Sequence, residues 1–145
     1  MRLVVRLATS QDAETAIALD RAAARDAHRR DWLRQAFAGR HGRVARLVFA
    51  DDAPAGFAVV GEFFGHPFLE LILTAAGFQR RGVASALMAK IEQDHLDQRL
   101  FVSTNESNTV MRGMLTARGY EPAGQVDHLD PGDPELFFVR RPTSS

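Results

Sequence analysis

Hydrophobic and polar positions along this chain follow two periods, which predict an alternation of strands and helices. Short apolar runs between turn residues predict strands at residues 3–7, 44–50, 55–64, 68–74, 99–103, 120–126 and 136–139. Apolar residues spaced three or four apart predict helices at residues 10–24, 31–38, 83–96 and 108–118. The order β, α, α, three β, α, β, α, two β predicts a mixed α/β sheet with helices on its faces, in one domain spanning residues 1–145.

Capping residues sharpen the ends of these helices. Thr9 and Ser10 offer side-chain oxygens at the start of the first helix, and Ser107 offers one to the last. Gly39 and Gly119 are natural C-terminal stops.

Composition and charge exclude several kinds of function. The chain has 18 basic and 18 acidic residues, so no net charge draws it to nucleic acid or to acidic membranes. It has no cysteine, which excludes disulfides, thiolate metal sites and cysteine nucleophiles. Its five histidines show no spacing typical of a metal site, so we expect no metal. The first residues are too interrupted by charge for a signal peptide, and no apolar stretch would span a bilayer, so we expect a cytoplasmic protein.

The segment of residues 79–84, Gln-Arg-Arg-Gly-Val-Ala, is the most informative stretch of the chain. It follows a predicted strand and opens a predicted helix, whose first N–H groups are free and whose dipole favours negative charge. Gly82 lets the backbone approach a ligand, and Arg80 and Arg81 flank the same spot. Together these features predict a cradle for phosphate groups.

The same segment resembles the pyrophosphate-binding motif Gln/Arg-x-x-Gly-x-Gly/Ala of the GNAT N-acetyltransferases, through Gln79, Gly82 and Ala84. A second segment resembles that family's Asn-x-x-Ala, Leu-Tyr, Gly-Phe signature, with matches at Asn108, Gly119 and Tyr120. The order of elements is also the family's order. The resemblance implies a mostly antiparallel sheet of about six or seven strands with about four helices. It also implies acetyl-CoA as co-substrate and direct transfer of the acetyl group to an amine.

The resemblance further implies which residues bind coenzyme A. The backbone N–H groups of four residues would hold the pyrophosphate: Gly82, Val83, Ala84 and Ser85. Gln79 would start the loop, while Arg80 and Arg81 would face either the phosphates or solvent.

A strand end and an asparagine complete the implied coenzyme site. The backbone of Leu73, Thr74 and Ala75 would pair with the pantetheine arm, and the Thr74 N–H would polarise the thioester carbonyl. Asn108 would bind the pantetheine side, or would make only a local cap at its helix.

The chain departs from the family pattern in two places. Leu115 stands where many relatives have the tyrosine that protonates the leaving thiolate, and residues 75–77 replace the usual proline before the cradle. The general acid is therefore unassigned. Ser103, Thr104 and Tyr120 are candidates by topology, and a proton transfer from the ammonium or through water would need no acid residue.

Glu70 is the first candidate for the general base. It interrupts an apolar strand, where a carboxylate is costly unless it faces a cleft or pairs with a cation. Strand alternation predicts that it shares a face with Thr74, and relatives often carry a base at about this place. The alternative is a structural ion pair with an arginine. Glu62 on the neighbouring strand is the second candidate, and His66 is the third.

These features favour an acetyl-CoA-dependent N-acetyltransferase acting on a primary amine of a small molecule or a peptide-like acceptor. The alternative is a catalytically weak or inactive regulatory module that keeps the fold and binds coenzyme A. We expect neither nucleic acid nor membrane as partner, and a homodimer formed through sheet edges is compatible with this fold.

Overall fold

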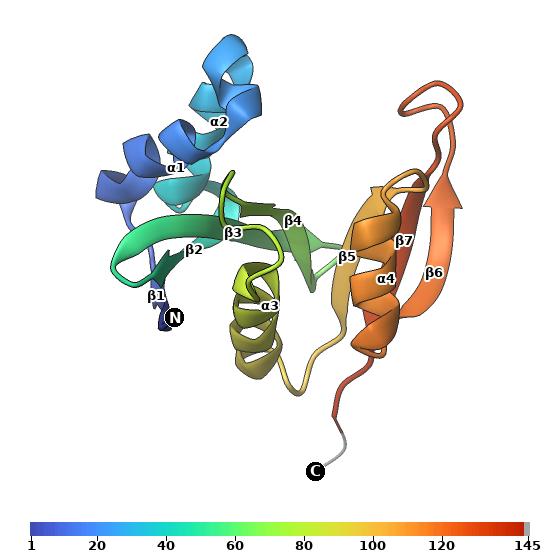
Figure 1. The fold of residues 1–145 in the computed structure, drawn as a ribbon. Coiled ribbons are helices and arrows are strands. Elements are labelled where there is room, and N and C mark those ends of the chain that lie inside the picture. Colours follow the sequence, from blue (N-terminus) through green and yellow to red (C-terminus); the bar gives the residue numbers. More distant parts are fainter. Residues whose placement is uncertain (144–145) are drawn as a thin grey trace. The chain divides into compact units, whose positions relative to one another are not determined.

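Seven strands form one sheet in the order β1-β2-β3-β4-β5-β7-β6 (Figure 1). The computed structural model describes residues 1–143, and the last two residues of the predicted 1–145 domain lie outside the described residues. The strands are β1 (Leu3–Leu7), β2 (Val44–Ala50), β3 (Ala53–Phe63), β4 (His66–Thr74), β5 (Leu100–Asn105), β6 (Glu121–Val126) and β7 (Glu135–Arg140). The helices are α1 (Ala13–Leu19), α2 (Ala27–Phe37), α3 (Val83–Asp94) and α4 (Thr109–Ala117).

The predicted order of elements and the fold class are confirmed. β4 and β5 run parallel, whereas β1 with β2, β2 with β3, β5 with β7 and β6 with β7 are antiparallel. Internal contacts divide the chain into two compact parts. We call Met1–Glu62 with Glu70–Asp94 the first unit, and Phe63–Leu69 with the described residues from His95 onward the second unit.

In the first unit, α1 and α2 cover one face of the central strands. Alternating residues of β2 and β3, among them Leu47 and Phe57, are fully buried against apolar residues of these helices, such as Leu33 and Phe37. The rings of Phe37 and Phe57 meet edge to face with centroids 5.7 Å apart. This burial fixes the helices to the sheet, because apolar area removed from water is the main favourable contribution to folding.

Helix α3 packs on the opposite face of the first unit. Arg46 lies between the inward-facing Ala45 and Leu47 of β2, so its side chain points to the other side of the sheet, where it pairs with Asp94 at the end of α3. The helix buries four apolar residues at helical spacing: Val83, Leu87, Met88 and Ile91.

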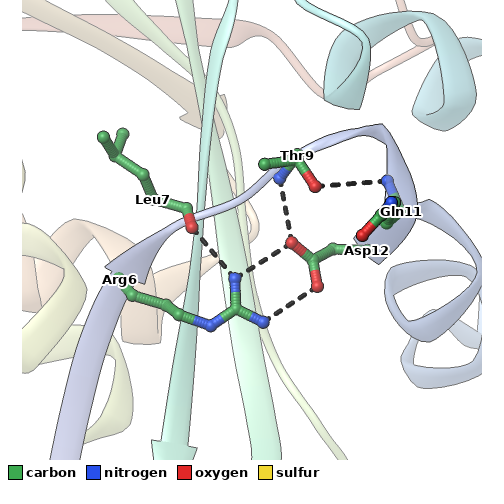
Figure 2. A network of polar contacts seen from close by, with 5 residues as sticks. All are labelled: Arg6, Leu7, Thr9, Gln11 and Asp12. Carbon is green, nitrogen blue, oxygen red and sulfur yellow. Dashed lines mark hydrogen bonds and ion pairs between the residues drawn. The ribbon is translucent and has the colours of Figure 1, made fainter.

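A capping network joins β1 to the first helical turn (Figure 2). The Thr9 hydroxyl accepts a hydrogen bond from the Gln11 N–H at 3.3 Å, while the Thr9 N–H donates to Asp12 at 2.9 Å. Arg6 donates two hydrogen bonds to the Asp12 carboxylate, at 3.0 and 2.9 Å. Mainly because of these bonds from Arg6, the pKa of Asp12 lies below its ordinary value, and the pKa of Arg6 is raised. Thr9 thus caps this turn as predicted.

The alanine-rich helix is shorter than the sequence pattern predicted. α1 ends at Leu19, Asp20 is extended (φ −99°, ψ 107°), and a short 3-10 helix follows at Arg21–Arg25. Asp20 is only 3% exposed, accepts a hydrogen bond from the Ala22 N–H, and pairs with Arg29 Nε at 2.7 Å. Its side chain therefore competes with the helical pattern and stops α1, a local effect that apolar periodicity does not reveal.

The second unit contains β5, β6 and β7 of the sheet together with α4. β5 buries Leu100, Val102 and Thr104, and α4 buries Leu115. β6 is an edge strand in which every residue is exposed, and its register with β7 shifts between Pro122 and Gly124.

Candidate active site

The loop of residues 79–84 presents its backbone at the surface, as a phosphate cradle requires. Gln79, Arg80, Arg81 and Gly82 are exposed, whereas Val83 is buried and anchors the start of α3. The Gly82 carbonyl accepts the Ala86 N–H at 2.9 Å, so the helix begins directly after this glycine. The N–H groups that follow are the free donors of a helix N-terminus.

The shape of this loop depends on two residues in the left-handed backbone region. Gly82 has φ +81°, which glycine adopts without cost. Arg80 has φ +63°, a conformation that costs a residue with a Cβ roughly 1–2 kcal/mol. A strained residue inside a candidate binding loop is consistent with a conformation kept for a ligand.

The charges around the loop favour an anion. The first turn of α3 carries no acidic residue that would compete with a bound phosphate. Arg81 lies over the ring of Phe78, with its guanidinium carbon 5.9 Å from the centroid. Both arginine side chains remain exposed to solvent. The assignment of these residues to coenzyme A stays a prediction.

The end of β4 is held closely against β3 in the first unit. The Ala75 N–H donates to the Ala55 carbonyl at 2.8 Å, so it is already used within the sheet. A Cβ on Gly56 would overlap the Leu73 carbonyl oxygen, so this glycine allows the close approach of the two strands. Thr74 is half-buried, and its role toward the thioester stays a prediction.

Glu70 forms an ion pair with Arg43, the residue that precedes β2. Arg43 Nε lies 2.6 Å from Glu70 Oε2, and Arg43 Nη2 lies 3.4 Å from Oε1. Both side chains are largely buried, at 17% and 20% exposure. The guanidinium also stacks on Trp32 of α2, 5.3 Å from the ring centroid. Arg43 is therefore the cationic partner that offsets the cost of a carboxylate in this apolar strand.

The face on which Glu70 lies differs from the prediction. Its carboxylate sits over Gly61, on the same side as Phe57 and Val59 of β3. Leu71 and Leu73 pack against that same helix-covered core. Strict alternation therefore fails between Glu70 and Leu71, so the prediction that Glu70 and Thr74 share a face is wrong.

The other candidate bases have fewer contacts. Glu62 is exposed on β3. His66 is half-buried at the start of β4 in the second unit, where its ring lies 5.5 Å from that of Phe101. Neither side chain has a geometry comparable to the pair that holds Glu70.

The start of α4 corrects one expectation about capping. Asn108, rather than Ser107, is the N-cap: its Oδ1 accepts the Met111 N–H at 3.1 Å. Ser107 instead donates through its N–H and its hydroxyl to Asp133, at 3.0 and 2.6 Å. Asn108 caps the helix one residue later because a β6–β7 loop carboxylate already uses Ser107. Its coenzyme role stays a prediction.

The residues considered for the general acid are mostly buried. Leu115 is fully buried in the second unit, so it packs the core at the position where the resemblance implies a tyrosine in many relatives. Thr104 and Tyr120 are 8% and 4% exposed, and Ser103 is half-buried.

Two residues around Glu70, Arg43 and Gly61, were not singled out from the sequence, and the contact of Trp32 with Arg43 was not predicted. The only signal was the charge of Glu70 in an apolar strand, which asks for a cation without saying which arginine supplies it. Arg43 also lines an open hollow of about 370 Å³ between the end of β1, the end of α2 and the start of β2.

Among residues 1–143, no group of three or more His, Asp or Glu side chains is placed to hold a metal ion. None of the helices in that stretch combines the length and apolar composition that crossing a bilayer requires.

Comparison with known proteins identifies the family. The family model described as "Acetyltransferase (GNAT) family" matches residues 6–120. A GNAT-family acetyltransferase from Bacillus cereus ATCC 10987 is 30% identical, with 99% of this chain and 100% of that chain covered and a TM-score of 0.87. A comparison with curated proteins found no significant match.

Two further solved structures are similar in fold. One is a ribosomal-protein-alanine N-acetyltransferase from Brucella melitensis, 17% identical over 95% of this chain and 99% of that chain, with a TM-score of 0.73. The other is an acetyltransferase from Bacillus anthracis str. Ames in complex with acetyl coenzyme A, 13% identical over 68% of this chain and 62% of that chain, with a TM-score of 0.62. The chain belongs to the GNAT family of acetyltransferases, and it is an acyltransferase with acetyl-CoA as donor.

Proposed function

We propose that this enzyme transfers the acetyl group of acetyl-CoA directly to a primary amine, with Glu70 as the general base. The observation that carries the assignment of the base is the geometry of Glu70: a largely buried carboxylate, held in one orientation by Arg43 inside an apolar strand. Glu62 is exposed and, among residues 1–143, has no ion pair comparable to that of Glu70, so it is the second candidate for the base. The acceptor is a small molecule or a peptide-like amine; the resemblance in fold to a ribosomal-protein-alanine N-acetyltransferase supports the second class.

The reaction needs two proton transfers and one exchange of bonds. Glu70, directly or through water, takes a proton from the acceptor ammonium, which frees the nitrogen lone pair. The nitrogen attacks the thioester carbonyl carbon, so that a C–N bond forms and the C–S bond breaks. The thiolate leaves and takes up the second proton, which comes from the former ammonium nitrogen either directly or relayed through a water molecule. No acid residue is required, which agrees with a buried leucine at position 115.

The donor is held by the residues predicted for coenzyme A. The N–H groups of residues 82–85 bind the pyrophosphate, and Arg80 and Arg81 add positive charge. The Thr74 N–H polarises the thioester carbonyl. Asn108 uses only Oδ1 for its helix cap, so its Nδ2 is the atom that it offers to the coenzyme.

Calorimetric titration with acetyl-CoA, followed by thiol release with a panel of amines and N-terminal peptides, tests this function. We expect binding and turnover with at least one acceptor. Glu70→Gln should lower kcat on the order of 100-fold or more, because a general base contributes about that much. Glu62→Gln is the matched control and should keep the wild-type rate. A lost rate in the control and an unchanged rate in Glu70→Gln would transfer the role to Glu62.

The alternative, a regulatory module that binds coenzyme A without turnover, is favoured by Leu115 and by the engagement of Glu70 with Arg43. Tight binding of acetyl-CoA with no thiol release from any amine of the panel would support it.

A further inference from the structure

Glu70 is held unequally at its two oxygens. Oε2 accepts a short hydrogen bond of 2.6 Å from Arg43 Nε, whereas Oε1 has only a long contact of 3.4 Å with Nη2. Because a hydrogen bond weakens steeply with length, Oε2 carries most of the interaction. Oε1 is therefore the oxygen that remains to accept a proton.

Arg43 is itself held by a second contact. Its guanidinium stacks on the indole of Trp32, which α2 presents from the helical layer of the first unit. A planar guanidinium that stacks on a ring and donates a hydrogen bond at the same time has little freedom to rotate. A lysine ammonium in its place would rotate freely. The orientation of the Glu70 carboxylate is thus tied to α2 through Arg43.

Gly61 supplies the space that the carboxylate occupies. A Cβ at this position would lie 2.6 Å from Oε2, 2.7 Å from the carboxyl carbon and 3.1 Å from Oε1 of Glu70. Gly61 does not have a positive φ, so its backbone would accept alanine without strain. The atoms in the way belong to the flexible end of one side chain, so alanine would displace the carboxylate and leave the strand in place.

We propose that Trp32, Arg43 and Gly61 are positioning residues for Glu70: they fix the carboxylate through Oε2 and leave Oε1 to take the acceptor proton. The inference rests on the proposed function, because the group that these residues position is the general base proposed there. None of the three residues touches the reacting atoms in this role.

Trp32 gives the first test a readout that needs no acceptor, because it is the only tryptophan of the chain. We expect Arg43→Met, Glu70→Gln and Gly61→Ala each to change the indole emission, since each alters how the guanidinium lies on the ring. Arg46→Met is the matched control: its pair with Asp94 has a similarly buried arginine, at 13% exposure, but lies on the other face of the sheet. Its emission should equal that of the wild type.

Steady-state kinetics with an amine that the panel turns over gives the second test. We expect Arg43→Met and Gly61→Ala to lower kcat by on the order of 10- to 100-fold, the range that misplacement of a reacting group by about 1 Å produces. The KM for acetyl-CoA should stay unchanged. Arg43→Lys should recover part of the loss, because it restores the charge without the fork. Arg46→Met should keep the wild-type kcat in the folded fraction.

The outcomes separate this inference from the proposed function. A wild-type rate in Glu70→Gln would overturn the assignment of the base, and the positioning role with it. A low rate in Glu70→Gln together with wild-type rates in Arg43→Met and Gly61→Ala would keep the base and overturn the positioning. Unchanged indole emission in Gly61→Ala would also overturn it, whatever the acceptor.

Discussion

The cradle loop and the surroundings of Glu70 lie in the same unit, yet they are built in opposite ways. The loop takes its shape from main-chain angles, at Arg80 and Gly82, and its side chains stay exposed. Glu70 takes its orientation from side chains of other elements, and its carboxylate is largely buried. A site made of backbone should tolerate most side-chain changes, whereas a site made of a side-chain network should tolerate few.

The largest expected effect comes from the buried leucine that replaces the family's tyrosine. Leu115→Ala should lower the free energy of unfolding by about 3–4 kcal/mol, because Leu115 is fully buried and its removal leaves a cavity. Chemical denaturation measures this loss. Leu115→Tyr should destabilise by overpacking and should not raise kcat. A faster Leu115→Tyr enzyme would show that catalysis depends on an acid in α4 as well as on Glu70.

Asp20 is a second held carboxylate in the first unit, and it checks whether being held by an arginine signals catalysis. Asp20→Ala should cost about 3 kcal/mol of stability, since it leaves Arg29 without its partner; we expect the lower end of the range because Arg29 is 30% exposed. Thermal unfolding measures it, with the exposed Glu14→Ala as a control of much smaller effect. At a temperature where the variant is folded, kcat should be unchanged. A selective loss of kcat in Asp20→Ala would mean that the Asp20–Arg29 pair also serves catalysis, as we propose for the Glu70–Arg43 pair.

Gly82→Ala tests the backbone origin of the cradle. A Cβ here would meet only Leu3 at 3.8 Å, so the cost comes from the left-handed φ of +81°, roughly 1–2 kcal/mol. We expect acetyl-CoA to bind about tenfold more weakly by calorimetry, because that strain distorts the loop. The kcat at saturating donor should not change. Undiminished affinity would mean that the loop does not bind through its main chain.

Arg80→Gly should separate shape from charge in the same loop. Glycine relieves the strain at φ +63° and should raise the stability of the protein by up to about 1 kcal/mol. The loss of one positive charge should at the same time weaken acetyl-CoA binding, more at low salt than at high salt. Arg80→Asn, which also tolerates this backbone region, controls for the strain. If the wild type and Arg80→Gly bind acetyl-CoA with equal affinity at every salt concentration, Arg80 faces solvent and does not contact the phosphates.

The smallest effect concerns the network that joins β1 to the first helical turn, just before α1 (Figure 2). The pKa of Asp12 is lowered in the folded protein, chiefly by the hydrogen bonds from Arg6, relative to the ordinary 3.8. Its contribution to stability is therefore complete above that value and is lost as the pH falls below it. Asp12→Asn should cost about 0.5 kcal/mol at neutral pH, and less at pH 3. Unfolding at both pH values measures this, and a difference that grows in acid would contradict it.

Features built from residues that are neighbours in the sequence could be predicted from it. Features built from residues of several different elements could not. Strands at residues 3–7 and 44–50 were predicted with their observed bounds, because alternation is a local property. The loop of residues 79–84 is equally local. The surroundings of Glu70 come from residues 32, 43 and 61, which only the fold brings together.

Two of the errors have the same origin. Periodicity could not show that Asp20 would end α1 by bonding Arg29, or that Ser107 would be taken by Asp133 and leave Asn108 as the cap. In both cases a hydrogen bond to a residue of another element or loop overrode the local preference of the sequence. The sharing of a face by Glu70 and Thr74 failed because one strand position broke the alternation.

The exposed edge strand β6 has a consequence for how this protein behaves in crowded solution. Pro122 offers no N–H, and the register shift that follows it, with Gly124 at φ +113°, interrupts the row of donors and acceptors along the rim. Such a rim is a poor template for a strand from another molecule, so it protects the folded chain from edge-to-edge aggregation. Two copies that associate by extending their sheets would have to do so elsewhere than along β6.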